Sequence, residues 1–235
     1  MFESTRTDID ICNIDEQVTC KVNNNDKCIR LITSKDIYWN LIDENTIPPT
    51  CIKSWNDRLE ITYDPKKWEN IFLLPFQCTN DLKIKELQMK ILHRFYPCQS
   101  LVAKWDKETS KICYLCNEDV ANIAHTFWKC KVISAFWDDI LQWLMPAIFQ
   151  YTSNLDSEKI LFGILPYTVG NHCVNHCLFY CKYHIHVQQL NKKKTTLESF
   201  KTYYRNVLEV EQALYVLRNE KKLFDNLFKR VVNIL

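Results

Sequence analysis

The chain has 235 residues, of which 47% are apolar and 13% aromatic, so it can bury a sizeable core. It contains two glycines where average usage would give about 16. This scarcity excludes the Gly-rich phosphate loops of dinucleotide-binding proteins and P-loop NTPases. The formal net charge is +2, but residues 171–235 hold 11 Lys and Arg against 5 Asp and Glu. Such a basic C-terminal third points mildly to a phosphate-bearing partner, although solvated helix faces would give the same composition.

Twelve cysteines make up about 5% of the chain. The first 30 residues carry several acidic side chains and no uninterrupted apolar stretch, so no secretory signal is expected. No apolar run is long enough to cross a bilayer. We therefore expect an intracellular protein, cytoplasmic or nuclear, with no membrane partner. In that compartment a cysteine cluster is more often a metal site than a set of disulfides.

The N-terminal region, which we place at residues 1–63, is expected to contain one hairpin and short helices. Residues 18–22 and 27–32 alternate roughly with period two, and the polar residues 23–26 between them tolerate turn geometry. After the hairpin the apolar pattern becomes helical, and Ser34 can cap a short helix.

Residues 64–150 are expected to form a helical, metal-binding domain. Asp64 followed by Pro65 is a favourable helix start, and a second start lies near Asn80. A third helix should follow the Cys-rich stretch and end at Pro146. The apolar faces of the second and third helices are Ile84, Leu87, Ile91 and Phe95, and Ile133, Phe136, Trp137, Ile140, Leu141 and Leu144.

Residues 151–235 are expected to form a basic C-terminal region of three helices. A capping box at Thr195 and Glu198 should open the second of them. The fold class is therefore mainly α, with a small N-terminal β-hairpin. The apolar stripes of the three helices include Val174, Cys177, Leu178, Cys181 and Ile185, then Phe200, Tyr204 and Leu208, then Leu223, Leu227 and Val231.

One group of residues has the spacing of a metal site: Cys113-x2-Cys116-x8-His125-x4-Cys130. Two cysteines separated by two residues can place both thiolates on one ion, and a His/Cys pair can complete a tetrahedral Cys₃His set, which suits structural Zn²⁺. On a continuous α-helix His125 and Cys130 would lie about 140° apart. The chain must therefore bend between them, or Cys130 must begin the next element. We expect the helical domain to be built around this closed, structural zinc.

The same segment resembles the zinc-binding segment of LINE-type (non-long-terminal-repeat) retrotransposon reverse transcriptases. In that family a Cys-x2-Cys pair precedes a His, a Cys follows five residues after the His, and a Trp-containing helix comes next. The similarity extends over about residues 30–235. The matching stretches are Cys113–Cys116, Ile123–Cys130, Phe136-Trp137 and Trp143-Leu144, with flanks at Ile37–Trp55, Leu87–Arg94, Ile160–Gly163 and Leu178–Ile185.

The family's polymerase and nuclease residues are missing from this chain. We find no Tyr/Phe-Ala-Asp-Asp turn of the reverse-transcriptase palm and no endonuclease residues. The resemblance therefore implies a non-catalytic C-terminal segment that is not an enzyme by itself. Such a segment helps its parent protein bind template RNA in a retrotransposon ribonucleoprotein. The implied partners are RNA, with DNA as a second candidate, and the upstream reverse-transcriptase domains.

Several side chains are candidates for contacting RNA. The capping box is preceded by Lys192, Lys193 and Lys194. Their charges are unfavourable at the positive end of the helix dipole, and a bound polyanion would offset that repulsion. A solvated loop would have the same sequence. Aromatic rings near the cysteines could stack on unpaired bases or form a small core of their own. The full set of candidate contacts is Lys182, Lys192, Lys193, Lys194, Lys201, Arg205, Tyr114 and Trp128.

Two alternatives remain open from the sequence. Cys173, Cys177 and Cys181 recur every four residues and alternate with histidines, so this stripe could bind a soft metal. Because the stripe coincides with apolar residues, a buried core face is the favoured interpretation. The alternative function for the whole chain is a helical protein-interaction module whose zinc is purely structural.

Overall fold

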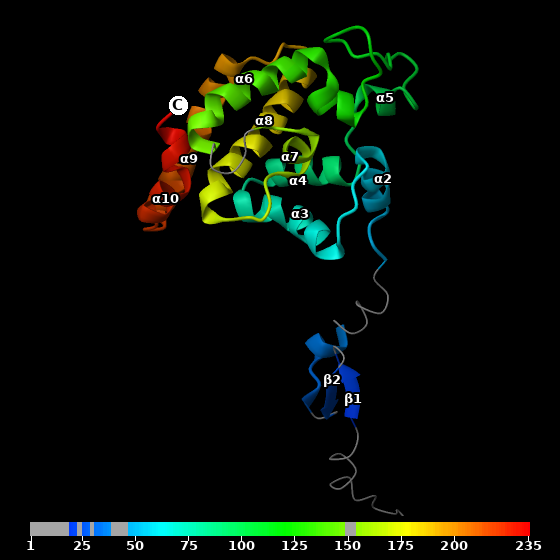
Figure 1. The fold of residues 1–235 in the computed structure, drawn as a ribbon, viewed down its shortest axis with the longest axis vertical. Coiled ribbons are helices and arrows are strands. Elements are labelled where there is room, and N and C mark those ends of the chain that lie inside the picture. The colour runs from blue at the N-terminus through cyan, green and yellow to red at the C-terminus, as the bar shows by residue number, and fades with distance from the viewer. Residues whose placement is uncertain (1–18, 23–24, 29–30, 39–46, 149–153) are drawn as a thin grey trace, which may run out of the picture. The chain divides into compact units, whose positions relative to one another are not determined.

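A computed structural model gives the fold, and its contacts divide the chain into two compact units, Met1–Pro49 and Thr50–Leu235. The division falls after Pro49 rather than at residue 63, and none falls at residue 150. We describe each unit by itself. The described residues are 19–22, 25–28, 31–38, 47–148 and 154–235 (Figure 1).

The first unit contains the expected hairpin, with a shifted second strand. Strands β1 (Thr19–Val22) and β2 (Asn25–Cys28) pair antiparallel, with Val22 opposite Asn25 and Thr19 opposite Cys28. The predicted strand over residues 27–32 is therefore wrong in its bounds, because pairing continues up to a connection at residues 23–24. A two-residue connection is the commonest in hairpins. Residues 23–24 themselves lie outside the described part.

A helical turn at residues 34–38 follows the hairpin. Its cap is Thr33 rather than the predicted Ser34: the Asp36 amide donates to Thr33 Oγ1 at 3.2 Å, and the Thr33 amide donates to Asp36 Oδ2 at 2.8 Å. Lys27 Nζ contacts the same carboxylate at 2.8 Å. These contacts hold the turn against β2 and keep the pKa of Asp36 well below its usual range.

The second unit is helical, as predicted, and its helices are connected largely by short loops. Figure 1 shows them gathered into one bundle. Their bounds are α2 (Thr50–Leu59), α3 (Pro65–Cys78), α4 (Leu82–Leu92), α5 (Gln99–Val102), the π-helix η3 (His125–Lys129), α6 (Lys131–Ile148), α7 (Ser157–Phe162), the 3₁₀ helix η4 (Val169–Asn171), α8 (His172–Leu190), α9 (Leu197–Leu217) and α10 (Lys221–Val232).

Helix ends show where local sequence rules held and where packing changed them. Asp64 caps α3 by accepting from the Lys67 amide at 2.8 Å, as predicted. The predicted α4 face ran to Phe95, but α4 ends at Leu92 and Phe95 is 74% exposed. Arg94 has a positive φ of 62°, so the chain has left the helix before Phe95. Pro146 lies inside the last turn of α6 instead of closing it.

The capping box of α9 lies one residue later than predicted. The Ser199 amide donates to Thr196 Oγ1, and the Thr196 amide donates to Ser199 Oγ, each at 3.3 Å. The predicted cap, Thr195, is buried instead. Both threonines satisfy the sequence preference for a cap, so only packing against the bundle distinguishes them.

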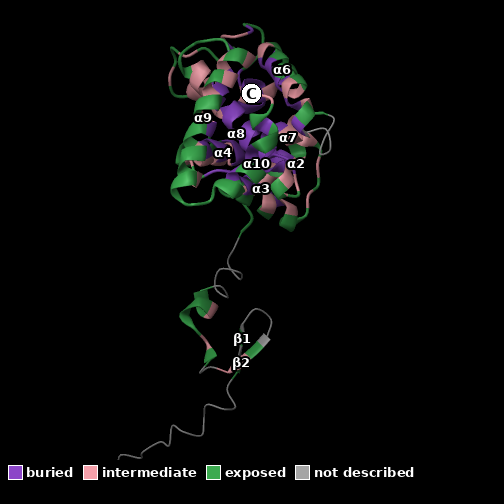
Figure 2. Cartoon of the chain, turned by 90° about the vertical axis from the view of Figure 1, so that its left-hand side faces the viewer, coloured by how far each residue is buried: buried purple, intermediate pink, exposed green. Residues whose placement is uncertain are grey.

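Helix α8 lies at the centre of the bundle and contacts α3, α4, α6, α9 and α10. Its first eleven residues are all buried, on every side of the helix (Figure 2). A helix with neighbours all round shows little amphipathicity, and its polar side chains must find internal partners. Asn175 does so by bonding both the amide and the carbonyl of Ile164, at 2.6 and 3.0 Å.

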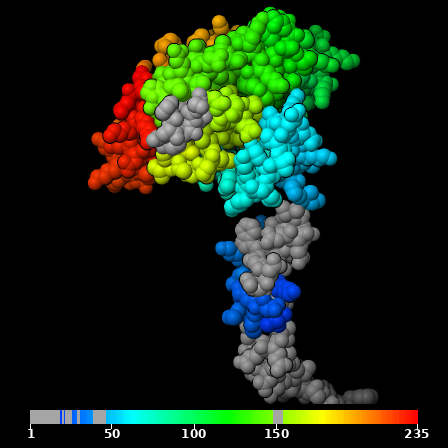
Figure 3. All heavy atoms as spheres, in the orientation of Figure 1, coloured from blue at the N-terminus to red at the C-terminus, as the bar shows by residue number. Residues whose placement is uncertain are grey.

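The outer helices enclose this core. In the space-filling view, α6 covers the upper edge of the helical unit and α10 closes one end (Figure 3). Within the described residues, no helix combines the length and the apolar character needed to cross a membrane.

Candidate metal centre

Two of the four predicted ligands, Cys113 and Cys116, lie in a tight loop. A β-bridge between Ile112 and Val120 closes the base of this loop. The Asn117 amide donates to the Cys113 carbonyl at 2.8 Å, and Asn117 has a left-handed φ of 58°. Asn tolerates this backbone region better than most residues. The loop therefore turns sharply enough to direct both sulfurs to one side.

The other two ligands are brought together by the π-helix η3. The Cys130 amide bonds the His125 carbonyl at 3.1 Å, five residues back, which is the hydrogen-bond pattern of a π-turn. The wider turn places side chains five residues apart closer to one face than an α-helix does. Cys130 itself is extended, and α6 begins at the next residue. The bend that the spacing required is thus a π-turn followed by a break.

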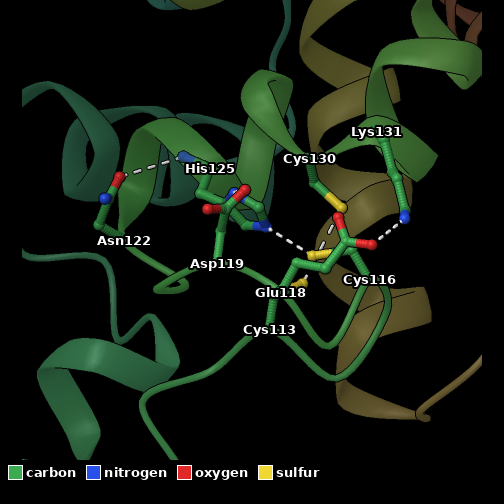
Figure 4. A network of polar contacts seen from close by, with 8 residues as sticks. All are labelled: Cys113, Cys116, Glu118, Asp119, Asn122, His125, Cys130 and Lys131. Carbon is green, nitrogen blue, oxygen red and sulfur yellow. Dashed lines mark hydrogen bonds and ion pairs between the residues drawn. The ribbon is translucent and has the colours of Figure 1, made fainter.

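All four side chains converge, and all four are buried (Figure 4). Their ligand atoms lie within 4.8 Å of one another. Cys113 Sγ is 3.9 Å from Cys130 Sγ, and Cys116 Sγ is 3.4 Å from His125 Nε2. Ligands about 2.0–2.3 Å from a tetrahedral ion lie roughly 3.3–3.8 Å apart, so these separations suit one metal ion.

A second layer of contacts orients the cluster. Asp119 Oδ2 lies 3.7 Å from His125 Nδ1, on the side of the ring away from the sulfurs. A carboxylate in this place favours the proton on Nδ1 and leaves Nε2 free to bind a metal. The His125 amide donates to Asn122 Oδ1 at 3.1 Å. Lys131 Nζ pairs with Glu118 beside the cysteines.

Electrostatics at the cluster favour the deprotonated form of His125 and Cys116 that a metal requires, and oppose it at Cys130. Burial lowers the pKa of His125, although Asp119 opposes this, so the ring is neutral at pH 7. Burial raises the pKa of Cys116, but the backbone amides of Asp119 and Glu118 outweigh it and the net shift is downward. Burial raises the pKa of Cys130 to about 11. A cation at the centre would offset that cost.

The cluster can therefore hold a metal ion with four protein ligands, which leaves no position for a reactive water. The chain matches no model of a known protein family. Within the described residues, the sulfurs of the α8 stripe do not form a comparable group with other ligands. Cys173, Cys177 and Cys181 are buried in the core, in keeping with the favoured interpretation.

Some of the predicted RNA-contacting residues are exposed in the structure, and others are buried. Lys192, Lys193 and Lys194 are exposed in the turn between α8 and α9. Lys182 is 1% exposed and donates through Nζ to the Leu161 carbonyl at 2.9 Å, so its placement on a phosphate-binding surface was wrong. The reason is that the first eleven residues of α8, which end at Lys182, are buried on all sides.

The remaining candidates lie on α9 and near the cysteines. Lys201 is half-buried, 3.6 Å from Glu198, and Arg205 is exposed and donates to the Leu235 carbonyl at 2.9 Å. Trp128 is half-buried. Tyr114 is half-buried too, with a hydroxyl that is enclosed without a hydrogen-bond partner, and burial raises its pKa to about 12.

Sequence reasoning missed the second layer around the ligands. The acidic pair at residues 118–119 follows Cys116 within three positions, and this spacing was the available signal. Spacing alone does not tell which carboxylate approaches His125 and which one pairs with Lys131, because that depends on the fold of the loop.

Proposed function

We propose that the chain is a non-catalytic, Zn²⁺-binding and RNA-binding module of the kind found at the C-terminus of LINE-type reverse transcriptases. The observation that supports it most is the convergence of Cys113, Cys116, His125 and Cys130 on one point. Three thiolates and one imidazole in a closed set are typical of structural zinc. DNA is a second candidate ligand, and the proposed setting is intracellular, in a ribonucleoprotein with upstream reverse-transcriptase domains.

The end of α8 joins the candidate metal centre to the basic turn at residues 192–194. Gln189 Nε2 donates to the Thr126 carbonyl at 3.1 Å, which joins the last turn of α8 to η3. Residues 192–194 follow directly in the exposed turn. Lys192 has a positive φ of 53°, so the chain reverses there and presents the three lysines at the start of α9. Closely spaced cations of this kind suit phosphates without reading base sequence.

A salt titration tests RNA binding. In the variant with Lys192, Lys193 and Lys194 changed to Ala, affinity for unrelated single-stranded RNAs should fall by similar factors. The slope of log affinity against log salt should flatten by about 0.7 for each RNA phosphate that the variant no longer neutralises. Fluorescence anisotropy at several salt concentrations measures both quantities.

The matched control removes the same charge elsewhere, by changing the exposed residues Lys66, Lys221 and Lys222 to Ala. This control should leave most of the slope in place. Equal effects from the two triple variants would show that only net charge matters, which contradicts a defined RNA surface.

The alternative is a protein-interaction module with a structural zinc. It is favoured by the burial of Lys182 and by the local partners of Lys201 and Arg205, which reduce the number of free cations. An absence of RNA binding at low salt would support the protein-interaction module. For either function we expect no primer extension and no nicking, because the palm and nuclease residues were not found. Nucleotide incorporation on a primed RNA template would contradict this.

A further inference from the structure

A groove of about 590 Å³ lies between α8, α9 and the turn that joins α3 to α4. None of the four metal-binding residues lines it. Three tyrosines form much of its wall: Tyr180 and Tyr183 from α8, and Tyr203 from α9. The rings of Tyr180 and Tyr203 have centroids 6.2 Å apart. We call this hollow the tyrosine groove.

Glu211 of α9 also lines the tyrosine groove, and its carboxylate has no cationic partner there. The side chain is 12% exposed, and its Oε1 lies 3.8 Å from His176 Nε2, which is longer than a normal hydrogen bond. Among the described residues no Lys or Arg forms an ion pair with it. Arg218 acts on it from a distance, and the exposed Lys83 at the rim does not reach it.

His176 does not neutralise this charge. It is fully buried, and burial lowers its pKa despite the neighbouring Glu211. Its Nδ1 lies 2.8 Å from the hydroxyl of Tyr204, while its Nε2 has no hydrogen-bond partner. The contact with His176 lowers the pKa of Glu211, so the carboxylate is ionised at pH 7. A largely buried charge is normally paired with an opposite charge, and here the side chain that contacts Glu211 is the neutral ring of His176.

The groove has the chemistry to supply that partner from outside. Tyr183 and Tyr203 are half-buried, so part of each ring is accessible, whereas Tyr180 is 2% exposed. Tyrosine faces attract cations through their ring quadrupole, and aromatic walls are a known way to hold ammonium groups. Asp81 adds a second carboxylate at the rim. Val210 and Leu214 are exposed along the same groove and offer an apolar surface. We propose that the tyrosine groove binds an alkylammonium cation, with the ammonium beside Glu211 and the aliphatic chain over Val210 and Leu214.

Titration of the full chain with hexylammonium chloride tests this site. Binding measured by calorimetry should weaken at least tenfold in Glu211→Gln. It should be unchanged in Glu209→Gln, a matched control on the same helix whose side chain lines a different hollow. Hexanol has the same chain without the charge and should bind weakly and equally to all three proteins. Equal binding of hexanol and hexylammonium, or an unaffected Glu211→Gln, would overturn the proposal.

Two further measurements keep the result unambiguous. Removing an uncompensated charge should leave the thermal unfolding midpoint of Glu211→Gln unchanged or raised. A marked fall would show instead that Glu211 is a structural partner of His176, and would overturn the proposal. Spermidine represents a free amine, and a lysine-centred tripeptide represents a side chain of a partner protein. Glu211-dependent binding of either probe supports the site and shows which source it accepts. The proposed cation site does not depend on RNA binding, so it can be correct or wrong independently of the proposed function.

Discussion

Lys182 was expected to contact RNA at the surface, and it is buried in the core instead. Its Nζ lies inside the bundle, 2.9 Å from the Leu161 carbonyl and 4.6 Å from the centre of the Phe179 ring. The same carbonyl accepts from Gln88 Nε2 at 2.7 Å, so it keeps a donor if Lys182 is removed. Burial lowers the pKa of Lys182 well below its ordinary value, although the nearby Cys181 and Cys78 oppose this.

We expect Lys182→Met to be more stable than the parent protein near pH 7. Between the lowered pKa of the folded state and the ordinary pKa of about 10.4, the unfolded chain binds the extra proton, so stability rises with pH. The variant loses this dependence, and its advantage should shrink toward pH 9–10, by at most about 1.4 kcal/mol per pH unit. Urea unfolding at several pH values measures the difference.

The exposed Lys194→Met is the control, and its unfolding free energy should follow that of the parent protein at every pH. A Lys182→Met protein that is destabilised equally at all pH values would mean that the lysine is charged and paired in the folded state.

At the scale of elements, the start of α9 depends on which of two adjacent threonines is the cap. Thr196 Oγ1 accepts from the Ser199 amide, whereas Thr195 Oγ1 is buried and has no hydrogen-bond partner. Thr196→Ala should therefore cost about 1 kcal/mol of unfolding free energy, the usual loss for a cap. Thr195→Val replaces an unsatisfied hydroxyl with a methyl group and should be neutral or stabilising.

Denaturant unfolding of the two single variants compares them directly. If Thr195→Val were the less stable of the two, the cap would be Thr195, which would contradict the start of α9 described above.

At the scale of the whole molecule, the Cys₃His cluster joins a loop with little regular structure to the helical core. Residues 103–122 contain only turns, bends and one bridge, while Phe127 and Cys130 are fully buried in that core. A metal that binds the folded state alone stabilises it by mass action. We expect one Zn²⁺ per chain, and a chelator should lower the unfolding temperature of the helical unit as a whole.

Cys130→Ser should abolish that zinc, as measured by native mass spectrometry. Cys98→Ser is the matched control, since Cys98 is also buried and lines the same small hollow as Cys113 and Cys130 without being among the four ligands. Retention of zinc by Cys130→Ser, or its loss from Cys98→Ser, would assign the wrong ligand set.

Much of this architecture was accessible from local patterns. Helical periodicity, the cap at Asp64 and the Cys₃His spacing depend on neighbours within a few residues, so the mainly α fold and the Cys₃His group could be predicted without a structure. The spacing even required a bend between His125 and Cys130, although it did not specify a π-turn.

Tertiary packing decided the rest. A helical stripe does not tell whether the opposite face meets solvent or another helix, so the sequence placed Lys182 outside and the bundle placed it inside. The cap at Thr196 and the place of Glu211 beside the buried His176 likewise depend on helices far apart in the chain. Local sequence determines which conformation a segment prefers, whereas burial and the pairing of charges depend on which segments surround it.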